Sequence, residues 1–430
     1  MSTERYQLSQ EMLTRALKSI PLGSQTFSKS NTQYPKGVSP HFISRGKGSY
    51  VWDVDGNKYI DFVNSLGAIT LGYNDPDVND AVQNQLESGT IFSLAHPLEL
   101  QVAEKIIEMV PCAEMVRFGK NGSDATSGAI RLARAFTQRD HVAVCGYHGW
   151  QDWYIGSTAR NLGVPKAVQA LTHTFQYNNI NSLEQIFSQY PEQIAAVILE
   201  PMSGIFPENN FLHEVKNLTH HHHSVLIFDE VVTGFRYANG GAQEYFNVIP
   251  DLATFGKGLA NGYPLSAIAG RADMMALMQD IFYSFTFGGE TLSLAAAFAT
   301  LNKLQTQPIL TSMHQQGDKL FTTVNQLIEK HKLNEFIKMI GHSSQPLIII
   351  KDTKNYTQWQ IKTLFLQEIF ARGILFIGAH NMSYTHRAED IVTLLAVYDE
   401  VFKMMNDAIL NNKLTQYLHC EPLIPLFKIR

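Results

Sequence analysis

The sequence predicts an α/β protein with a large, mainly parallel sheet and a second, smaller α+β domain. Between about residues 76 and 305, helical patterns alternate with short apolar runs, clearest at Val142–Cys145, Ala195–Leu199 and Val225–Phe228. This alternation is typical of parallel strands joined by helices. From about residue 310, helical patterns mix with the apolar runs Pro346–Ile350 and Ile374–Ile377. The second pattern indicates a separate, smaller layer at the C-terminal end.

The N-terminal part is polar and mixed up to about residue 48, with an amphipathic helix expected near Glu11–Ile20. Tyr50–Ile60 then alternates between apolar and polar residues on both sides of Asp55–Asn57, which predicts a hairpin. We therefore expect three regions. They are an N-terminal segment, 1–75, that contributes to the small domain and the substrate site, a large domain, 76–310, and a C-terminal small domain, 311–430.

Composition narrows the class of protein. The 430 residues are 45% hydrophobic and 17% charged, which favours a packed globule. A net charge of -5 argues against nucleic acid as a partner. The three cysteines are odd in number and form no CxxC pair, which favours a reducing compartment. The polar N-terminus does not resemble a signal peptide, and no apolar run approaches the roughly 20 residues of a membrane span. We expect a cytoplasmic protein.

Lys257 is the most informative single residue. It lies between Gly256 and Gly258, directly after an apolar run that is expected to form a strand. Flanking glycines allow a large flat group to approach the backbone. A lysine amine held there can form a Schiff base with an aldehyde. This points to pyridoxal phosphate, which also needs a carboxylate for its ring nitrogen, a nest for its phosphate and an aromatic ring to stack on.

Two segments match the first two needs. Asp229 ends the apolar run that begins at Val225, and ligands of open α/β sheets bind at the carboxyl ends of strands. A carboxylate beside a pyridine nitrogen keeps it protonated. Asn121, Gly122 and Ser123 precede a helical pattern, so their amides favour an anion. Taken alone, Asp229 is explained equally well as a solvated residue at a strand end. The segment from Asn121 to Ser123, taken alone, is explained as an ordinary helix cap.

Two further segments match the remaining needs. Tyr147 and His148 follow the strand expected at Val142–Cys145 and can stack on a flat ring. Thr286 begins a Thr-Phe-Gly-Gly turn, whose hydroxyl and amides suit a phosphate, before a helix expected at Leu292–Leu301. Each is also explained by ordinary loop packing. The order of all five signals along one chain favours the cofactor.

Other interpretations are weaker. The run His220–His223 can bind metal, but a solvated helix end explains it better, and we predict no metal site. The glycines of 256–262 have the spacing GxGxxxG, late in the chain, which does not fit a dinucleotide loop. A non-catalytic regulatory module of the same fold remains an alternative, although such a protein is expected to lose Lys257 or Asp229.

The chain resembles the class III aminotransferases, which are fold type I pyridoxal phosphate enzymes, and within them the glutamate-1-semialdehyde 2,1-aminomutase group. The likeness spans roughly 35 to 400 and rests on 50–63, Leu71-Gly-Tyr73, Glu200-Pro201 and Asp229-Glu-Val-Val-Thr-Gly-Phe-Arg236. It implies a homodimer with shared active sites, and a lysine that serves as general acid and base.

The resemblance also implies a role for each matching residue. Lys257 is the catalytic lysine, Asp229 the partner of the ring nitrogen, and Val231 and Tyr147 the contacts on the two ring faces. The other cofactor-binding residues implied are Asn121, Gly122, Ser123, His148, Glu200, and Thr286, the last reaching the neighbouring subunit's phosphate.

Three departures from the aminomutase pattern lie on the substrate side. His41 stands near the place of an arginine that binds the substrate carboxylate, and Arg45 is offset from it. Leu66 replaces a tryptophan, and 378–386 lacks a glutamate. Arg236 either pairs with a substrate carboxylate or is structural. We therefore expect an intermolecular aminotransferase that uses an amino donor and a sugar-like or other carbonyl acceptor, with the intramolecular aminomutase as the alternative.

Overall fold

The computed structural model describes residues 3–424, which divide into two compact units. One unit combines residues 3–75 with 311–424, and the other contains residues 76–310. We call them the terminal unit and the central unit and describe each by itself.

The central unit is built on a seven-stranded sheet with the order β4-β10-β9-β8-β7-β5-β6. The five strands from β9 to β6 run parallel, whereas β10 is antiparallel to both β4 and β9. The strands are β4 Met115–Gly119, β5 His141–Cys145, β6 Thr172–Thr174, β7 Ile194–Leu199, β8 Val225–Asp229, β9 Leu252–Phe255 and β10 Ser266–Gly270. The expected mainly parallel sheet is confirmed.

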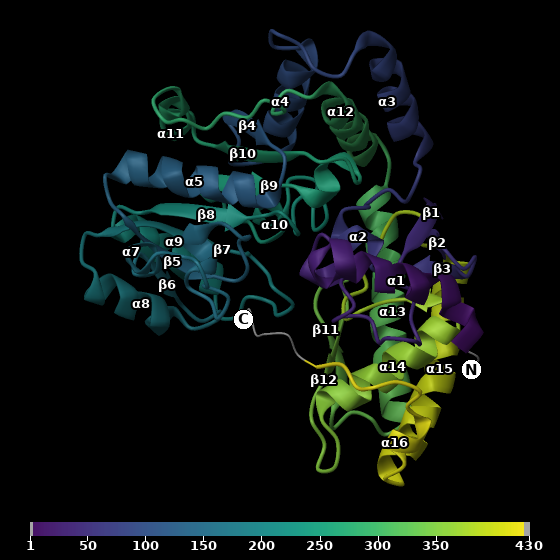
Figure 1. The fold of residues 1–430 in the computed structure, drawn as a ribbon. Helices are drawn as coiled ribbons and strands as arrows, with labels where there is room; N and C mark the ends of the chain where they lie inside the picture. Colours follow the sequence, from purple (N-terminus) through teal and green to yellow (C-terminus); the bar gives the residue numbers. More distant parts are fainter. Residues whose placement is uncertain (1–2, 425–430) are drawn as a thin grey trace. The chain divides into compact units, whose positions relative to one another are not determined.

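Helices cover both faces of this sheet (Figure 1). Successive side chains of a strand point to opposite faces. Val142, Ala196 and Ile227 accordingly pack towards α5, Gly122–Thr137, whereas Ala143, Val197 and Leu226 pack with residues of α8 and α9. The remaining elements of the unit are α3 Pro76–Ser88, α4 Pro97–Met109, α6 Asp152–Ile155, α7 Lys166–Gln169, α8 Ile180–Gln189, α9 Phe211–His221, α10 Ala242–Tyr245, η4 Lys257–Ala260, α11 Ala272–Met275, η5 Ala276–Gln279 and α12 Thr291–Thr306.

The terminal unit joins the two ends of the described chain in one sheet of order β1-β2-β3-β13. Its strands are β1 Ile43–Lys47, β2 Tyr50–Asp53, β3 Lys58–Asp61 and β13 Ile374–Leu375. The hairpin of β2 and β3 is antiparallel, as expected, and β13 lies parallel to β3. The N-terminal and C-terminal segments therefore form a single α+β structure.

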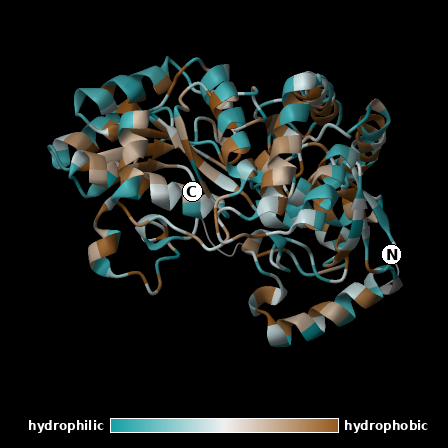
Figure 2. Cartoon of the chain, turned by 90° about the horizontal axis from the view of Figure 1, so that it is seen from above, coloured by the Kyte–Doolittle hydropathy of each residue, from teal (hydrophilic) through white to brown (hydrophobic). Residues whose placement is uncertain are grey.

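A second, two-stranded sheet and long helices complete the terminal unit. The two strands are β11 Ile337–Ile340 and β12 Leu347–Ile350, and the helices are η1 Thr3–Tyr6, α1 Gln7–Ser19, η2 Pro21–Gly23, η3 Phe27–Lys29, α2 Asn64–Gly67, α13 Ile309–Lys330, α14 Gln358–Ala371, α15 Ala388–Leu410 and α16 Leu414–Tyr417. Phe365 of α14 stacks on Phe402 of α15 with ring centroids 5.9 Å apart. Most helices carry both hydrophobic and hydrophilic residues (Figure 2), as elements with one buried side do. Within residues 3–424, we find no helix with both the length and the apolar character of a membrane span.

Several element boundaries differ from those expected. Helix α1 begins at Gln7 rather than near Glu11, because the carboxylate of Asp55 accepts hydrogen bonds from the amides of Leu8 and Ser9 at 2.7 and 3.0 Å. Strand β13 is shorter than the apolar run from Ile374 to Ile377. Helix α12 is longer than expected and ends at Thr306, shortly before a proline.

Candidate active site

Asp229 lies at the carboxyl end of β8, in the middle of the parallel part of the sheet. Its side chain points to the same face of the sheet as those of Val225 and Ile227, which pack towards α5. Its carboxylate is 4% exposed and accepts three hydrogen bonds. The ring Nδ1 of His148 lies 2.7 Å from Oδ2, and the Val231 amide and the Thr254 hydroxyl donate to Oδ1 at 3.1 and 3.4 Å. The carboxylate is thus held in one orientation at the edge where ligands bind.

His148 is fixed at both ring nitrogens. In addition to its bond with Asp229, its Nε2 lies 3.2 Å from the carbonyl oxygen of Cys145. Asp229 and the carbonyl of Cys145 therefore hold the ring from both sides. The hydroxyl of Thr126 donates to the backbone carbonyl of His148 at 2.8 Å, which ties this loop to α5. His148 is therefore a buried ring whose orientation is fixed beside Asp229.

Gly122 and Ser123 are the first residues of α5, so their amides are among those that have no partner within the helix. A side chain at Gly122 would bring its Cβ to 2.9 Å from Cγ1 of Val231. Glycine is therefore required where α5 approaches Val231. The Ser123 hydroxyl accepts a hydrogen bond from the Trp150 amide at 3.4 Å. The start of α5 is thus joined to the loop that carries Tyr147 and His148.

Lys257 begins the short helix η4, two residues after β9 ends at Phe255. Its φ of 42° lies in the left-handed region, which non-glycine residues adopt mostly at turns and functional sites. A Cβ placed on Gly256 would lie 3.5 Å from Cγ1 of Val231 and 3.8 Å from Cα of Gly122. The backbone beside Lys257 therefore borders both Val231 and the start of α5.

Tyr147 and Glu200 follow strands β5 and β7 at the same edge of the sheet. The Tyr147 ring is 38% exposed and meets Tyr154 edge-on at 5.7 Å. Glu200 is buried, and its amide donates to the carbonyl of Cys145 at 3.2 Å. A Cβ on Gly146 would lie 2.9 Å from Oε2 of Glu200. These contacts place the Glu200 carboxylate beside the loop that leads to Tyr147.

Thr286 lies on the exposed loop before α12, and among residues 3–424 it makes no hydrogen bond or ion pair with the residues above. The same loop is nevertheless anchored near α5. Glu290 accepts a hydrogen bond from Nζ of Lys120, adjacent to Asn121, at 3.0 Å, and it also accepts from the amides of Leu292 and Ser293. Partial burial would raise the pKa of Glu290, but hydrogen bonds from Ser293 and Lys120 hold that pKa below its usual value.

The central unit therefore meets the requirements of a pyridoxal phosphate site. A fixed carboxylate, a helix start with bare amides, and two glycines that leave room beside Val231 lie around the backbone of Lys257. Within residues 3–424, no three His, Cys, Asp or Glu side chains are grouped so as to hold a metal ion. His220 instead lies 2.9 Å from the carboxylate of Asp251.

The candidate substrate residues belong to different units. His41 and Leu66 lie in the terminal unit, and Arg236 lies in the central unit. Arg236 is buried, and burial lowers its pKa to about 10, so it stays charged at neutral pH. Leu66 follows Asn64 and Ser65 in a run of three left-handed residues with φ of 45°, 50° and 62°. Such a run is strained for residues that have side chains.

Sequence reasoning missed three residues that fix this arrangement. Thr254 lies directly opposite Asp229 in the register of β8 and β9, a pairing that becomes visible only when the strand order is known. Thr126 is a fully buried polar residue in α5. Its place among the alanines of the helix was the one signal in the sequence that could have indicated it. Glu230 accepts hydrogen bonds from Thr233 and from Gln243, which fastens the turn before α10. Its strand-end position did not reveal this.

Comparison with known proteins decides the family. A model of the class-III aminotransferase family matches residues 33–409. The chain belongs to the class-III aminotransferases. Among curated relatives, this aminotransferase is 33% identical to glutamate-1-semialdehyde 2,1-aminomutase 2 of Lachnoclostridium phytofermentans, covering 92% of this chain and 99% of the relative. It is also 33% identical to 3-aminobutyryl-CoA aminotransferase of Cloacimonas acidaminovorans, covering 94% of this chain and 100% of the relative.

Solved structures agree with this assignment. The aminotransferase is similar to the PLP internal aldimine form of the Sphingopyxis sp. MTA144 FumI protein, with a TM-score of 0.87, 27% identity, and coverage of 96% of this chain and 98% of that chain. It is also similar to an omega-transaminase from Sphaerobacter thermophilus, with a TM-score of 0.84, 25% identity, and coverage of 92% and 97%. The expected fold type I architecture, enzyme class and cofactor, pyridoxal 5'-phosphate, are confirmed.

Proposed function

We propose that this aminotransferase moves an amino group between two separate small molecules, an amino donor and a carbonyl acceptor. The observation that supports this most is the state of His41. Burial and the nearby Lys36 charge lower the pKa of His41 to about 4, so its ring is neutral at pH 7. A neutral ring is a poor partner for a carboxylate, whereas the aminomutase pattern has an arginine near this place.

Arg45 does not replace that arginine. Its guanidinium carbon lies 3.9 Å from the centroid of the Trp52 ring, in a cation–π contact on the hairpin. Neither His41 nor Arg45 thus offers a free cation near this position. The proposed substrate accordingly carries no carboxylate at the position where the aminomutase pattern binds one.

The other two departures from the aminomutase pattern, Leu66 and the segment 378–386, are connected within the terminal unit. The side chain of Asn381 donates to the carbonyl of Val63 at 2.9 Å, and the amide of Asn381 donates to the carbonyl of Phe62 at 2.8 Å. The left-handed run that carries Leu66 is thereby fastened to 378–386. We propose that these two segments form one wall of the substrate site and set its specificity.

We propose the following roles for the residues of the central unit, which we assign to cofactor binding. Lys257 would hold the cofactor aldehyde through its Nζ, and once a substrate amine has displaced that nitrogen, the freed lysine amine would move a proton at the substrate carbon. Asp229, oriented by His148, faces the ring nitrogen, and Val231 and Tyr147 contact the two ring faces. Bound pyridoxal phosphate supplies an electron sink for the substrate carbon.

The phosphate and the remaining polar contacts involve other residues. The amides of Gly122 and Ser123, with the side chain of Asn121, face the phosphate at the positive end of α5. Glu200 anchors polar groups near the ring. Thr286 reaches the phosphate of the neighbouring subunit.

A homodimer is supported by exposed apolar residues around Thr286. Phe282 and Phe287 are 82% and 58% exposed, and Leu94 is 85% exposed. The two segments touch, because the Thr291 amide donates to the carbonyl of Thr90 at 2.9 Å. Exposed apolar residues on neighbouring segments are typical of interaction surfaces, and two-fold dimers are the commonest assemblies. The three free cysteines fit a cytoplasmic location.

The alternative is intramolecular transfer, and the names of several relatives favour it. One relative, glutamate-1-semialdehyde 2,1-aminomutase of Desulforamulus reducens, is 38% identical over 73% of this chain and 77% of its own length. A single experiment separates the two functions. The holoenzyme is mixed with amino donors one at a time, and the change in cofactor absorbance is followed, with product formation from glutamate-1-semialdehyde measured in parallel.

The proposal expects a donor that converts the cofactor fully without any acceptor, together with glutamate-1-semialdehyde turnover near background. Rapid turnover of glutamate-1-semialdehyde would contradict it. Protein that stays colourless after incubation with pyridoxal phosphate would instead overturn the roles given to Lys257 and Asp229.

A further inference from the structure

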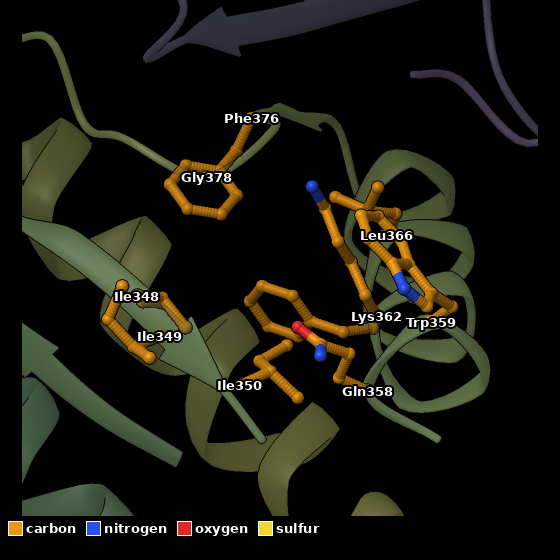
Figure 3. A pocket seen from close by; sticks show the side chains of 10 residues that line it. Ile348, Ile349, Ile350, Gln358, Trp359, Lys362, Leu366, Phe376 and Gly378 are labelled. Atoms are coloured by element: carbon orange, nitrogen blue, oxygen red, sulfur yellow. The ribbon is translucent and has the colours of Figure 1, made fainter. Parts of the chain in front are cut away.

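A cavity of about 180 Å³ lies between β12 and α14, wholly within the terminal unit. It does not include Lys257, which belongs to the central unit. Figure 3 shows its lining residues, which are apolar except for two. They are Ile348, Ile349, Ile350, Gln358, Trp359, Lys362, Phe365, Leu366, Phe376 and Gly378.

The walls are formed by fixed parts of the fold. Phe365, Leu366 and Phe376 are at most 1% exposed, so their positions are set by the core. On the opposite side, the amide of Ile348 donates to the carbonyl of Gly378 at 3.0 Å, which joins β12 to the chain after β13. The cavity is therefore largely preformed, as small-molecule sites are.

Lys362 supplies the only charge in this lining. Its side chain extends along the cavity, and its amine ends on the side of Phe376 (Figure 3). The Nζ atom lies 5.7 Å from the centroid of the Trp359 ring, and among residues 3–424 it has no hydrogen bond or ion pair. The nearest carboxylate in sequence, Glu368, instead accepts a hydrogen bond from Nη1 of Arg372 at 2.6 Å.

Lys362 is half-buried, and no group among residues 3–424 pairs with its ammonium. Desolvation alone lowers the pKa of Lys362 to about 8. A carboxylate placed beside the amine would restore a charged hydrogen bond, and an apolar body would fill the space between the isoleucines and the aromatic rings. An apolar cavity of about 150 Å³ accepts benzene, so this one has room for one ring or a branched chain.

We propose that this cavity is a second ligand site, which binds a small carboxylic acid with an aromatic or branched aliphatic body through Lys362. The carboxylate pairs with the ammonium, and the apolar body lies against Ile348, Phe365 and Phe376. The proposal is independent of the function assigned to Lys257.

The test uses the holoenzyme and phenylacetate, with binding followed by isothermal titration calorimetry. We expect saturable binding that weakens by at least about tenfold in Lys362→Met, because this variant keeps the apolar stem and removes the charged hydrogen bond. Lys354→Met is the matched control, because Lys354 is exposed and outside the lining. That variant should bind within about twofold of the wild type. Phenylacetamide, which lacks the charge, should bind the wild type about tenfold more weakly than phenylacetate does.

Three results would overturn the proposal. The first is that phenylacetate shows no saturable binding, and the second is that Lys362→Met binds it as tightly as the wild type does. The third is that a catalytic substrate at the site of Lys257 abolishes phenylacetate binding, because phenylacetate would then occupy that site. A second measurement serves if Lys362→Met fails to fold. Wild-type holoenzyme is treated with trinitrobenzenesulfonate, and peptide mass spectrometry follows each lysine. Phenylacetate should slow labelling of Lys362 and leave that of Lys354 unchanged, and equal labelling with and without phenylacetate would also refute the site.

Discussion

Replacing His148 with phenylalanine tests how the Asp229 carboxylate is held. The new ring keeps the aromatic volume, and with it the stacking on Trp153, whose ring lies 6.3 Å from that of His148. It removes the 2.7 Å contact with Asp229 and the 3.2 Å contact with the carbonyl of Cys145. The substitution therefore changes hydrogen bonding far more than packing.

The expected magnitude follows from the bond to Asp229. A hydrogen bond to a charged group contributes about 1.5–3 kcal/mol, which corresponds to roughly tenfold to a hundredfold in an equilibrium constant. Without His148, Oδ2 of Asp229 loses its donor, and only the bonds at Oδ1 from Val231 and Thr254 remain. We expect the Kd for pyridoxal phosphate to rise by about that factor, and kcat to fall with it.

The assay is a titration of the apoenzyme with pyridoxal phosphate, followed by absorbance. His141→Phe is the matched control, because His141 begins β5, whereas His148 follows its end, and His141 bonds His173 at 2.7 Å. It should leave the cofactor Kd unchanged. If His148→Phe bound the cofactor as tightly as the wild type, the orientation of Asp229 by His148 would play no part in cofactor binding.

Two other substitutions give separate tests. Gly122→Ala would place its Cβ 2.9 Å from Val231. We expect cofactor affinity to fall at least about tenfold while the fold survives, since overpacking costs about 1–3 kcal/mol, and unchanged affinity would show that α5 does not border the ring. Asn381→Ala removes side-chain bonds to Val63 and Gln345. It should lower the Tm by a few degrees and raise KM for the substrate with an unchanged cofactor Kd, whereas an unchanged KM would separate this residue from the substrate site.

The sequence predicted the parts of the fold that depend on local pattern. The apolar runs ending at Cys145, Leu199 and Asp229 became parallel strands, because fully buried strands need nothing but apolar residues and turn signals. Local pattern also predicted that Asp229 ends a strand and that Gly122 begins a helix. The helical pattern after Gly122 likewise predicted α5.

What the sequence did not predict depends on distant partners. The start of α1 is set by Asp55, whose carboxylate accepts hydrogen bonds from the amides of Leu8 and Ser9. These residues lie 47 and 46 positions away in the sequence. The left-handed run that carries Leu66 is held by Asn381, more than 300 residues away, and no local signal marks it. The pairing of Thr254 with Asp229 required the strand order.

The role of Lys257 can be measured most directly by trapping the bound cofactor. The holoenzyme is reduced with borohydride, digested and analysed by mass spectrometry to find the lysine that carries the phosphopyridoxyl group. We predict a single label, on Lys257, and an unlabelled, colourless Lys257→Ala variant. A label on another lysine, such as Lys362 with its lowered pKa of about 8, or the absence of any label, would contradict the assignment.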